Sequence, residues 1–153
     1  MAQSWKKLED QVRAIASLRW NAPCRPEHID GVDFDGVVRL PDEIILIEVT
    51  EESNLGKVRD DLNKILPIRM SLLMSGVVCR AYIVMSQEPT NSMKEVGVKQ
   101  HIQVLSVTDF ERAFFDFASY YRLRVDQQFG SAIDSKTGKN DPHSFVQVRY
   151  DVT

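Results

Sequence analysis

The sequence predicts an α/β fold in which a mixed central β-sheet is flanked by helices on both of its faces. Residues 32–39 and 43–50 are apolar runs rich in Val and Ile, which is typical of strands, and a Leu-Pro-Asp-Glu turn joins them into a hairpin. Segments with apolar residues at helical spacing precede and follow this hairpin. A further apolar run at 79–85 follows the second helical segment, so the sheet gains a strand after a helical crossover.

The first helix is expected at 4–20, with Ser4 as its N-cap. Its apolar or long side chains recur at helical spacing, at Trp5, Leu8, Val12, Ile15 and Arg19. The connector that follows is rich in turn residues and contains Pro23 and Pro26, with one short strand expected near 27–29.

The second helix is expected directly after the hairpin, with Ser53 or Asn54 as its N-cap. Pro67 is expected to kink or end this helix, and Gly76 is the expected stop of any continuation. Its apolar face comprises Leu55, Val58, Leu62, Ile65 and Leu66.

The C-terminal part predicts a short helix at 91–100, a short strand at 102–105 and a helical extension at 109–123, in which Thr108 and Glu111 form a capping box. The aromatic stripe of that extension is typical of a helix face that packs in the core or against a partner. We expect residues 1–125 to form one folded domain. Residues 126–153 are polar and turn-rich, and we expect them to be a linker or tail toward a further domain.

Composition narrows the function classes. The net charge of the 153 residues is −3, so any nucleic-acid binding must depend on local contacts to the phosphate backbone. The two cysteines, Cys24 and Cys79, form no CxxC pair, which argues against a disulfide framework or a zinc site. No run approaches the roughly 18 apolar residues of a membrane span, and the N-terminus lacks a signal-peptide core. We expect a cytoplasmic protein that does not associate with membranes.

Two acidic residues are placed unusually in the hairpin. Asp35 lies near the start of its first strand, and Glu48 follows Ile-Ile-Leu-Ile inside the second. A hairpin that turns at 40–43 brings these two positions side by side. A buried carboxylate is costly unless it is paired or binds a metal, although an Asp at a strand start also commonly bonds to turn amides.

A helix with an acid, then Asp35, Glu48, a helix and a buried strand resembles the PD-(D/E)xK nuclease superfamily, over residues 4–106. The resemblance implies a restriction-endonuclease-like αβββαβ core and hydrolysis of phosphodiester bonds in DNA. It implies that Asp35 and Glu48 bind Mg²⁺, for which Mn²⁺ can substitute, with the main-chain carbonyl of Val49 as a third ligand. Glu9, on the first helix, would bind a second metal or its water; the simpler interpretation of Glu9 is an ion pair with Arg13.

The chain departs from this family at position 50, where Thr replaces the lysine that usually assists the attacking water. Two interpretations stay open. In the first, the lysine function has moved to Lys57 on the second helix, although Lys57 also has the spacing to be a solvated partner of Asp61. In the second, the site is inactive and the fold serves as an interaction or dimerisation module, docking through the helix at 109–123.

The tail carries a second resemblance, in Phe129-Gly130-Ser131-Ala132, in the Thr137-Gly138 turn and in the alternating segment at 145–150. These segments are similar to the junction that follows the N-terminal nuclease domain of bacterial anti-phage STAND NTPases. The resemblance implies a DNA-cleaving effector in anti-phage defence. It also implies a fused NTPase or sensor domain and assembly as a homo-oligomer.

Overall fold

A computed structural model describes residues 2–113 of the chain. The chain divides into two units, Met1–Glu111 and Arg112–Thr153, and the architecture that follows is that of the first unit. The expected boundary after residue 125, the tail at 126–153 and most of the helix at 109–123 lie outside the described residues.

The described elements form a five-stranded mixed sheet and its flanking helices, which confirms the predicted fold class. In chain order they are α1 (Ala2–Trp20), β1 (Cys24–Ile29), β2 (Val32–Arg39), β3 (Glu43–Thr50), α2 (Leu55–Met74), β4 (Val78–Met85), α3 (Asn91–Lys99) and β5 (Gln103–Ser106). A further helix begins at residue 107 and is described as far as residue 113. The strand order is β1-β2-β3-β4-β5, with antiparallel pairing from β1 to β3 and parallel pairing from β3 to β5.

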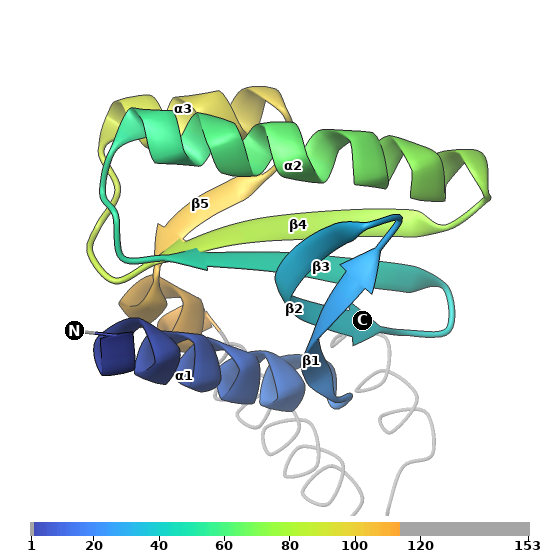
Figure 1. The fold of residues 1–153 in the computed structure, drawn as a ribbon, viewed down its shortest axis with the longest axis horizontal. Helices are drawn as coiled ribbons and strands as arrows, with labels where there is room; N and C mark the ends of the chain where they lie inside the picture. Colours follow the sequence, from blue (N-terminus) through green and yellow to red (C-terminus); the bar gives the residue numbers. More distant parts are fainter. Residues whose placement is uncertain (1, 114–153) are drawn as a thin grey trace, which may run out of the picture. The chain divides into compact units, whose positions relative to one another are not determined.

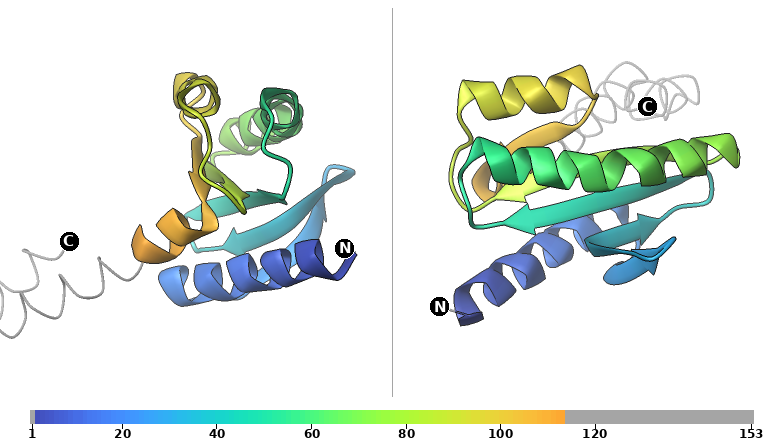
Figure 2. Two further views of the ribbon diagram at one scale, coloured as in Figure 1. Left: turned by 90° about the vertical axis from the view of Figure 1, so that its left-hand side faces the viewer. Right: turned by 45° about the horizontal axis from the view of Figure 1, so that its top comes forward.

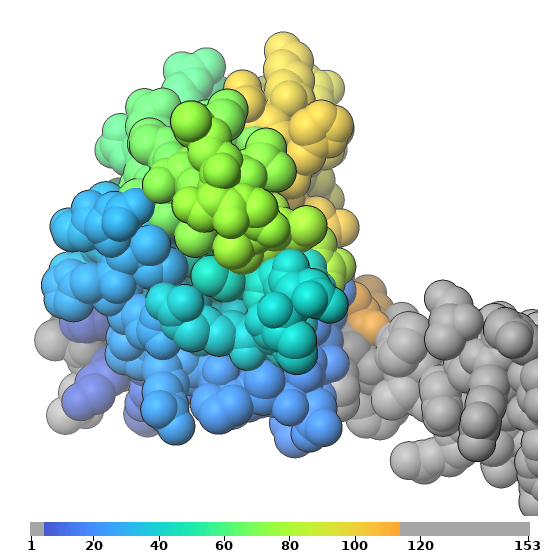
Figure 3. Space-filling view, turned by 90° about the vertical axis from the view of Figure 1, so that its right-hand side faces the viewer, coloured from blue at the N-terminus to red at the C-terminus, as the bar shows by residue number. Residues whose placement is uncertain are grey.

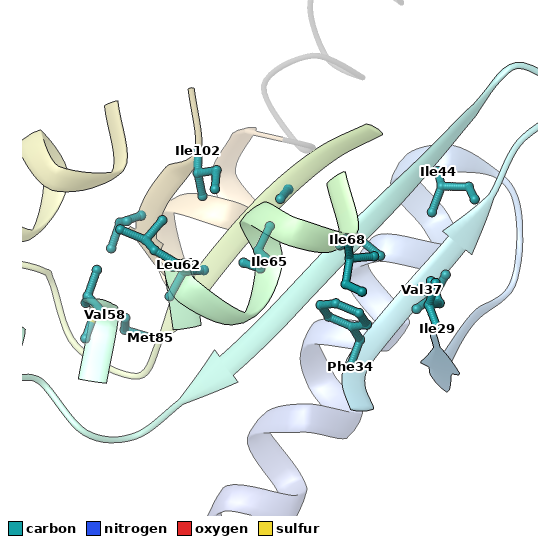
Figure 4. Close-up of a cluster of buried hydrophobic side chains, with 14 of the residues drawn as sticks. Ile29, Phe34, Val37, Ile44, Val58, Leu62, Ile65, Ile68, Met85 and Ile102 are labelled. Atoms are coloured by element: carbon teal, nitrogen blue, oxygen red, sulfur yellow. The ribbon is translucent and has the colours of Figure 1, made fainter. Parts of the chain in front are cut away.

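Helices cover the sheet on both faces, with α1 on one face and α2 and α3 on the other (Figures 1 and 2). The α1 face buries Val12 against Ile45 and Ile47 of β3. The α2 face buries Ile65 in a second cluster, with Phe34 of β2 and Ile68 beside it (Figure 4). Because β3 is covered on both faces, it is a continuous apolar run rather than an alternating one.

The helix α2 passes through Pro67 instead of ending there. Asn54 is its N-cap, with Oδ1 accepting a hydrogen bond from Lys57 N at 2.8 Å. Pro67 and Asn63 are both exposed, so water can bond to the Asn63 carbonyl that proline deprives of its helical donor. Gly76, with φ of +82°, follows the helix end in the left-handed conformation that glycine adopts readily.

Two predicted helix caps are wrong. Helix α1 begins at Ala2, which places Ser4 inside it. Thr108 also lies inside its helix, because that helix begins directly after β5. The cap there is Ser106, whose hydroxyl oxygen accepts a hydrogen bond from Asp109 N at 3.1 Å.

Among the described residues, no helix combines the length and the apolar character that crossing a membrane requires.

Candidate functional site

Asp35 and Glu48 lie where β2 and β3 separate. The two strands pair from Arg39↔Ile44 to Gly36↔Ile47, and at the next position side-chain hydrogen bonds replace strand pairing. Asp35 N donates to Glu48 Oε1 at 3.2 Å, and Val49 N donates to Asp35 Oδ2 at 2.8 Å. Each carboxylate therefore accepts a hydrogen bond from the main chain of the strand opposite its own.

A bulge in β2 positions Asp35. Arg25 pairs with Val37 and Glu27 with Phe34, so three steps along β2 face two steps along β1. The extra residue brings Phe34 and Val37 into the same core cluster, although strict alternation would place them on opposite faces.

Gly36, inside this bulge, lies in close contact with α1 and β1. A Cβ at this position would lie 2.8 Å from Cys24 Sγ and 3.6 Å from Arg13 Cγ, so a larger residue does not fit without rearrangement. The close approach lets Arg13 Nη1 donate to the Asp35 carbonyl at 2.8 Å. Helix α1 is thus tied to the main chain that carries Asp35.

Glu48 is the most perturbed acid of the site. Its side chain is 4% exposed, and Lys64 Nζ lies 2.9 Å from Glu48 Oε2. Burial and the nearby negative charge of Asp35 raise the pKa of Glu48 to about 7, against the opposing effect of Lys64. A carboxyl group with this pKa exchanges its proton near neutral pH, which suits proton transfer.

Lys64, which was not among the site residues predicted from the sequence, is the lysine that contacts the acidic pair. Its ammonium also lies 5.4 Å from the centroid of the Phe34 ring, within cation–π range. The sequence contains a signal for it, because Lys57, Asp61 and Lys64 share one face of α2 at i, i+4 and i+7. Only the position of α2 over the sheet shows which lysine reaches Glu48.

Lys57, the predicted catalytic lysine, forms an ion pair with Asp61 at 3.0 Å between Nζ and Oδ1. Asp61 is 2% exposed, and its Oδ2 is buried with no hydrogen-bond partner. Burial raises the pKa of Asp61, against the opposing hydrogen bond from Lys57. Burial lowers the pKa of Lys57, but the bond to Asp61 outweighs it, so that this pKa lies above its usual value and the amine is charged.

Glu9 forms the ion pair with Arg13 that the simpler interpretation predicted, and its metal-binding role stays a prediction. Arg13 Nη1 lies 3.2 Å from Glu9 Oε1, which is the expected helical ion pair. Burial raises the pKa of Glu9, and the negative charge of Asp35 raises it further, which places Glu9 near the acidic pair.

Asp35 and Glu48 are the residues that would hold a magnesium ion at this place, if the ion kept part of its water shell. Among the described residues, no group of three or more His, Cys, Asp or Glu is arranged to hold a metal. Asp35 and Glu48 supply two carboxylates. In a pleated strand the N–H and C=O of one residue point toward the same edge, so the Val49 carbonyl faces the side on which Val49 N bonds to Asp35. One or two carboxylates with waters and substrate oxygens are a common Mg²⁺ environment.

A hollow of about 270 Å³ adjoins this site. Trp5, Leu8 and Glu9 of α1 form one side of it, and residues 49–52 form the other. Because Glu9 and Val49 also border the acidic pair, a molecule bound in the hollow would lie beside the candidate metal ligands.

The fold and the site together define an α/β protein with a paired-acid site at the opening of a bent hairpin. Comparison with protein-family models, with curated protein sequences and with solved structures finds no match to this chain.

Proposed function

We propose that the chain is a metal-dependent nuclease domain that hydrolyses phosphodiester bonds of DNA. The observation that carries the proposal is the pairing of Asp35 with Glu48 across two strands, with Lys64 bonded to Glu48. The order of α1, β1, β2, β3, α2 and β4 supports it, because it is the αβββαβ order that the resemblance implies.

In this proposal Asp35, Glu48 and the Val49 carbonyl hold the ion. Bound Mg²⁺ would lower the pKa of a water molecule and stabilise charge on the phosphoryl oxygens. The hydrogen bond from Val49 N fixes the orientation of the Asp35 carboxylate before any ion arrives. Arg13 holds the Asp35 main chain in place and keeps Glu9 near it. This preorganisation reduces the reorganisation that binding requires.

Lys64 takes the role of the lysine that the chain lacks at position 50. It contacts Glu48, and an ammonium at that place can hold an attacking water or stabilise the charge of the transition state. Lys57 is a weaker candidate because its ammonium bonds to Asp61 and to neither acid of the pair.

The wider assignment rests on the resemblance of the tail. It comprises an effector in anti-phage defence, a fused NTPase or sensor domain and a homo-oligomer. A cytoplasmic location is proposed separately, from two cysteines that form no CxxC pair. The contacts to the DNA backbone would be non-specific and would be made by local lysines and arginines.

The test is metal binding and DNA cleavage by the purified chain. Calorimetry with Mg²⁺ or Mn²⁺ should show saturable binding that is lost in Glu48→Ala and in Asp35→Ala. Incubation with plasmid DNA should show metal-dependent cleavage that both substitutions abolish. Cleavage by the Asp35→Ala protein at the parental rate would refute this site.

The second candidate is an inactive interaction module that associates with a second copy of itself. The favouring observation is a set of exposed apolar side chains at the C-terminal end of α2 and the start of β4, with exposed fractions of 57% for Met70, 59% for Leu73 and 81% for Met74. Met70 and Leu73 also line a hollow of about 420 Å³, and Figure 3 faces this end of the molecule. Light scattering should then show a dimer that Leu73→Glu dissociates. Metal-dependent cleavage that is lost in Asp35→Ala would exclude the inactive module.

A further inference from the structure

The hollow beside the acidic pair is large enough for a heterocyclic ring and has an aromatic residue in its lining. Trp5, Leu8 and Glu9 lie three and four residues apart, so they share one face of α1. Trp5 is 48% exposed and forms part of the wall. A closed apolar cavity of about 150 Å³ holds a benzene molecule. The volume of about 270 Å³ is therefore ample for a six-membered heterocycle with its substituents.

The opposite side of the hollow is formed by residues 49–52, an acidic segment held in place by a hydrogen bond. Thr50 is 6% exposed, and its Oγ1 accepts a hydrogen bond from Glu52 N at 3.0 Å, which fixes the chain just after β3. Three of the seven lining residues are acidic: Glu9, which is paired with Arg13, Glu52, which accepts a hydrogen bond from Asn54 Nδ2 at 3.4 Å, and Glu51. The described residues that line the hollow include no lysine or arginine. The hollow therefore disfavours a phosphate group and favours a ligand that donates hydrogen bonds.

We propose that this hollow binds one unstacked nucleobase that carries an exocyclic amino group. The base stacks on Trp5 and donates its amino hydrogens to Glu51 or Glu52. Aromatic side chains stack on unpaired bases of any kind, and carboxylates accept hydrogen bonds from the amino group of cytosine. Thymine and uracil have no such group, so the hollow discriminates against them.

The inference rests on the proposed nuclease function and specifies its substrate. Val49 lines the hollow, and its main-chain N–H bonds to Asp35, so the bound base would belong to a nucleotide near the phosphate that the acidic pair acts on. A base can enter only after it leaves the stack of a duplex, which costs less in a single strand. The substrate class is therefore a single-stranded or locally opened strand.

Binding can be measured without phosphate, metal or cleavage. The chain has two tryptophans, so its NMR spectrum contains two indole N–H signals, and Trp20→Phe assigns the one from Trp5. Titration of the full chain with deoxycytidine or deoxyadenosine, in the presence of a chelator, should shift the Trp5 signal and the amide signals of Glu51 and Glu52. Thymidine should bind several times more weakly.

Matched variants separate stacking from hydrogen bonding. Trp5→Phe should retain binding, whereas Trp5→Ala should weaken it by about fivefold or more, as expected from the loss of one stacked base. The double variant Glu51→Gln, Glu52→Gln keeps the shape of the walls and should reduce the preference for deoxycytidine over thymidine. The amide signals of residues 49–52 report binding in all of these proteins.

Three results would overturn the inference. They are the absence of any shift at high nucleoside concentration, equal binding of thymidine, and stronger binding of lysine amide, which would make the hollow a general cation site. Because nucleosides contain no scissile bond, these results are independent of whether the chain cleaves DNA. A chain that binds the nucleosides but does not cut DNA would refute the proposed function alone.

Discussion

Asp35 and Glu48 each accept a main-chain hydrogen bond from the strand opposite their own, through Val49 N at 2.8 Å and Asp35 N at 3.2 Å. The two carboxylates thus occupy the position at which the β2–β3 pairing stops. The same bonds that terminate the hairpin also orient both acids, so a change that disturbs the hairpin opening should affect stability and metal binding together.

The raised pKa of Glu48 makes folding stability depend on pH. Its pKa is about 7 in the folded chain against 4.5 for an ordinary glutamate, so the folded state binds more protons between these values. Stability should therefore fall as pH rises through this window, by about 3 kcal/mol at most, and Glu48→Gln should remove most of the fall. Urea unfolding at pH 5 and pH 8 measures the effect.

The matched control for this pH dependence is Glu95→Gln, because Glu95 is exposed on α3. This variant should retain the parental fall in stability. If Glu48→Gln also retains it, Glu48 is ionised in the folded protein across the window and its environment is not as described.

Substitution of Lys64 should mainly reduce cleavage, whereas substitution of Lys57 should mainly reduce stability. Lys64→Met removes the cation bonded to Glu48, so the pKa of Glu48 should rise further and cleavage should fall by about 100-fold or more. Lys57→Met leaves Asp61 buried without its partner, so it should lower the free energy of unfolding by about 1–3 kcal/mol.

Cleavage assays and urea unfolding on both variants distinguish these effects. Adding Asp61→Asn to Lys57→Met should recover part of the lost stability, because it removes the unpaired charge. If Lys57→Met is stable but does not cleave DNA, and Lys64→Met remains active, then Lys57 and not Lys64 is the catalytic lysine.

Gly36→Ala should destabilise the chain by about 1–3 kcal/mol, because the new methyl group would lie 2.8 Å from Cys24 Sγ. Adding Cys24→Ala should restore much of the loss by removing the sulfur atom. Gly56→Ala, on the first turn of α2, is the control. A Cβ added at Gly56 would have Asn54 Oδ1 as its nearest neighbour, at 3.4 Å. Thermal unfolding of the three proteins, with metal binding by calorimetry, tests whether the bulge supports the site.

The sequence predicted those parts of the fold that depend on local pattern. The bounds of β2 and β3 agree with the expected runs at 32–39 and 43–50, because long Val- and Ile-rich segments have few alternatives to a strand. The proximity of Asp35 and Glu48 followed from the position of the turn.

Features that depend on packing between elements could not be predicted in this way. The bulge in β2 is visible only in its register with β1. The contact of Lys64 with Glu48 depends on how far α2 is displaced along the sheet, which spacing within the helix does not specify. Ser4 and Thr108 are good capping residues by type, but the helices begin before them.

The outer strand β1 limits how copies of this chain can associate. It pairs with β2 on one side, and no strand of the described residues pairs with its other side. Pro26 in this strand has no N–H to offer, and Arg25, Glu27 and His28 beside it are polar. Proline and charged residues at an edge disfavour the addition of a further strand. Any oligomer that forms should therefore assemble through side-chain packing and not by continuing the sheet across β1.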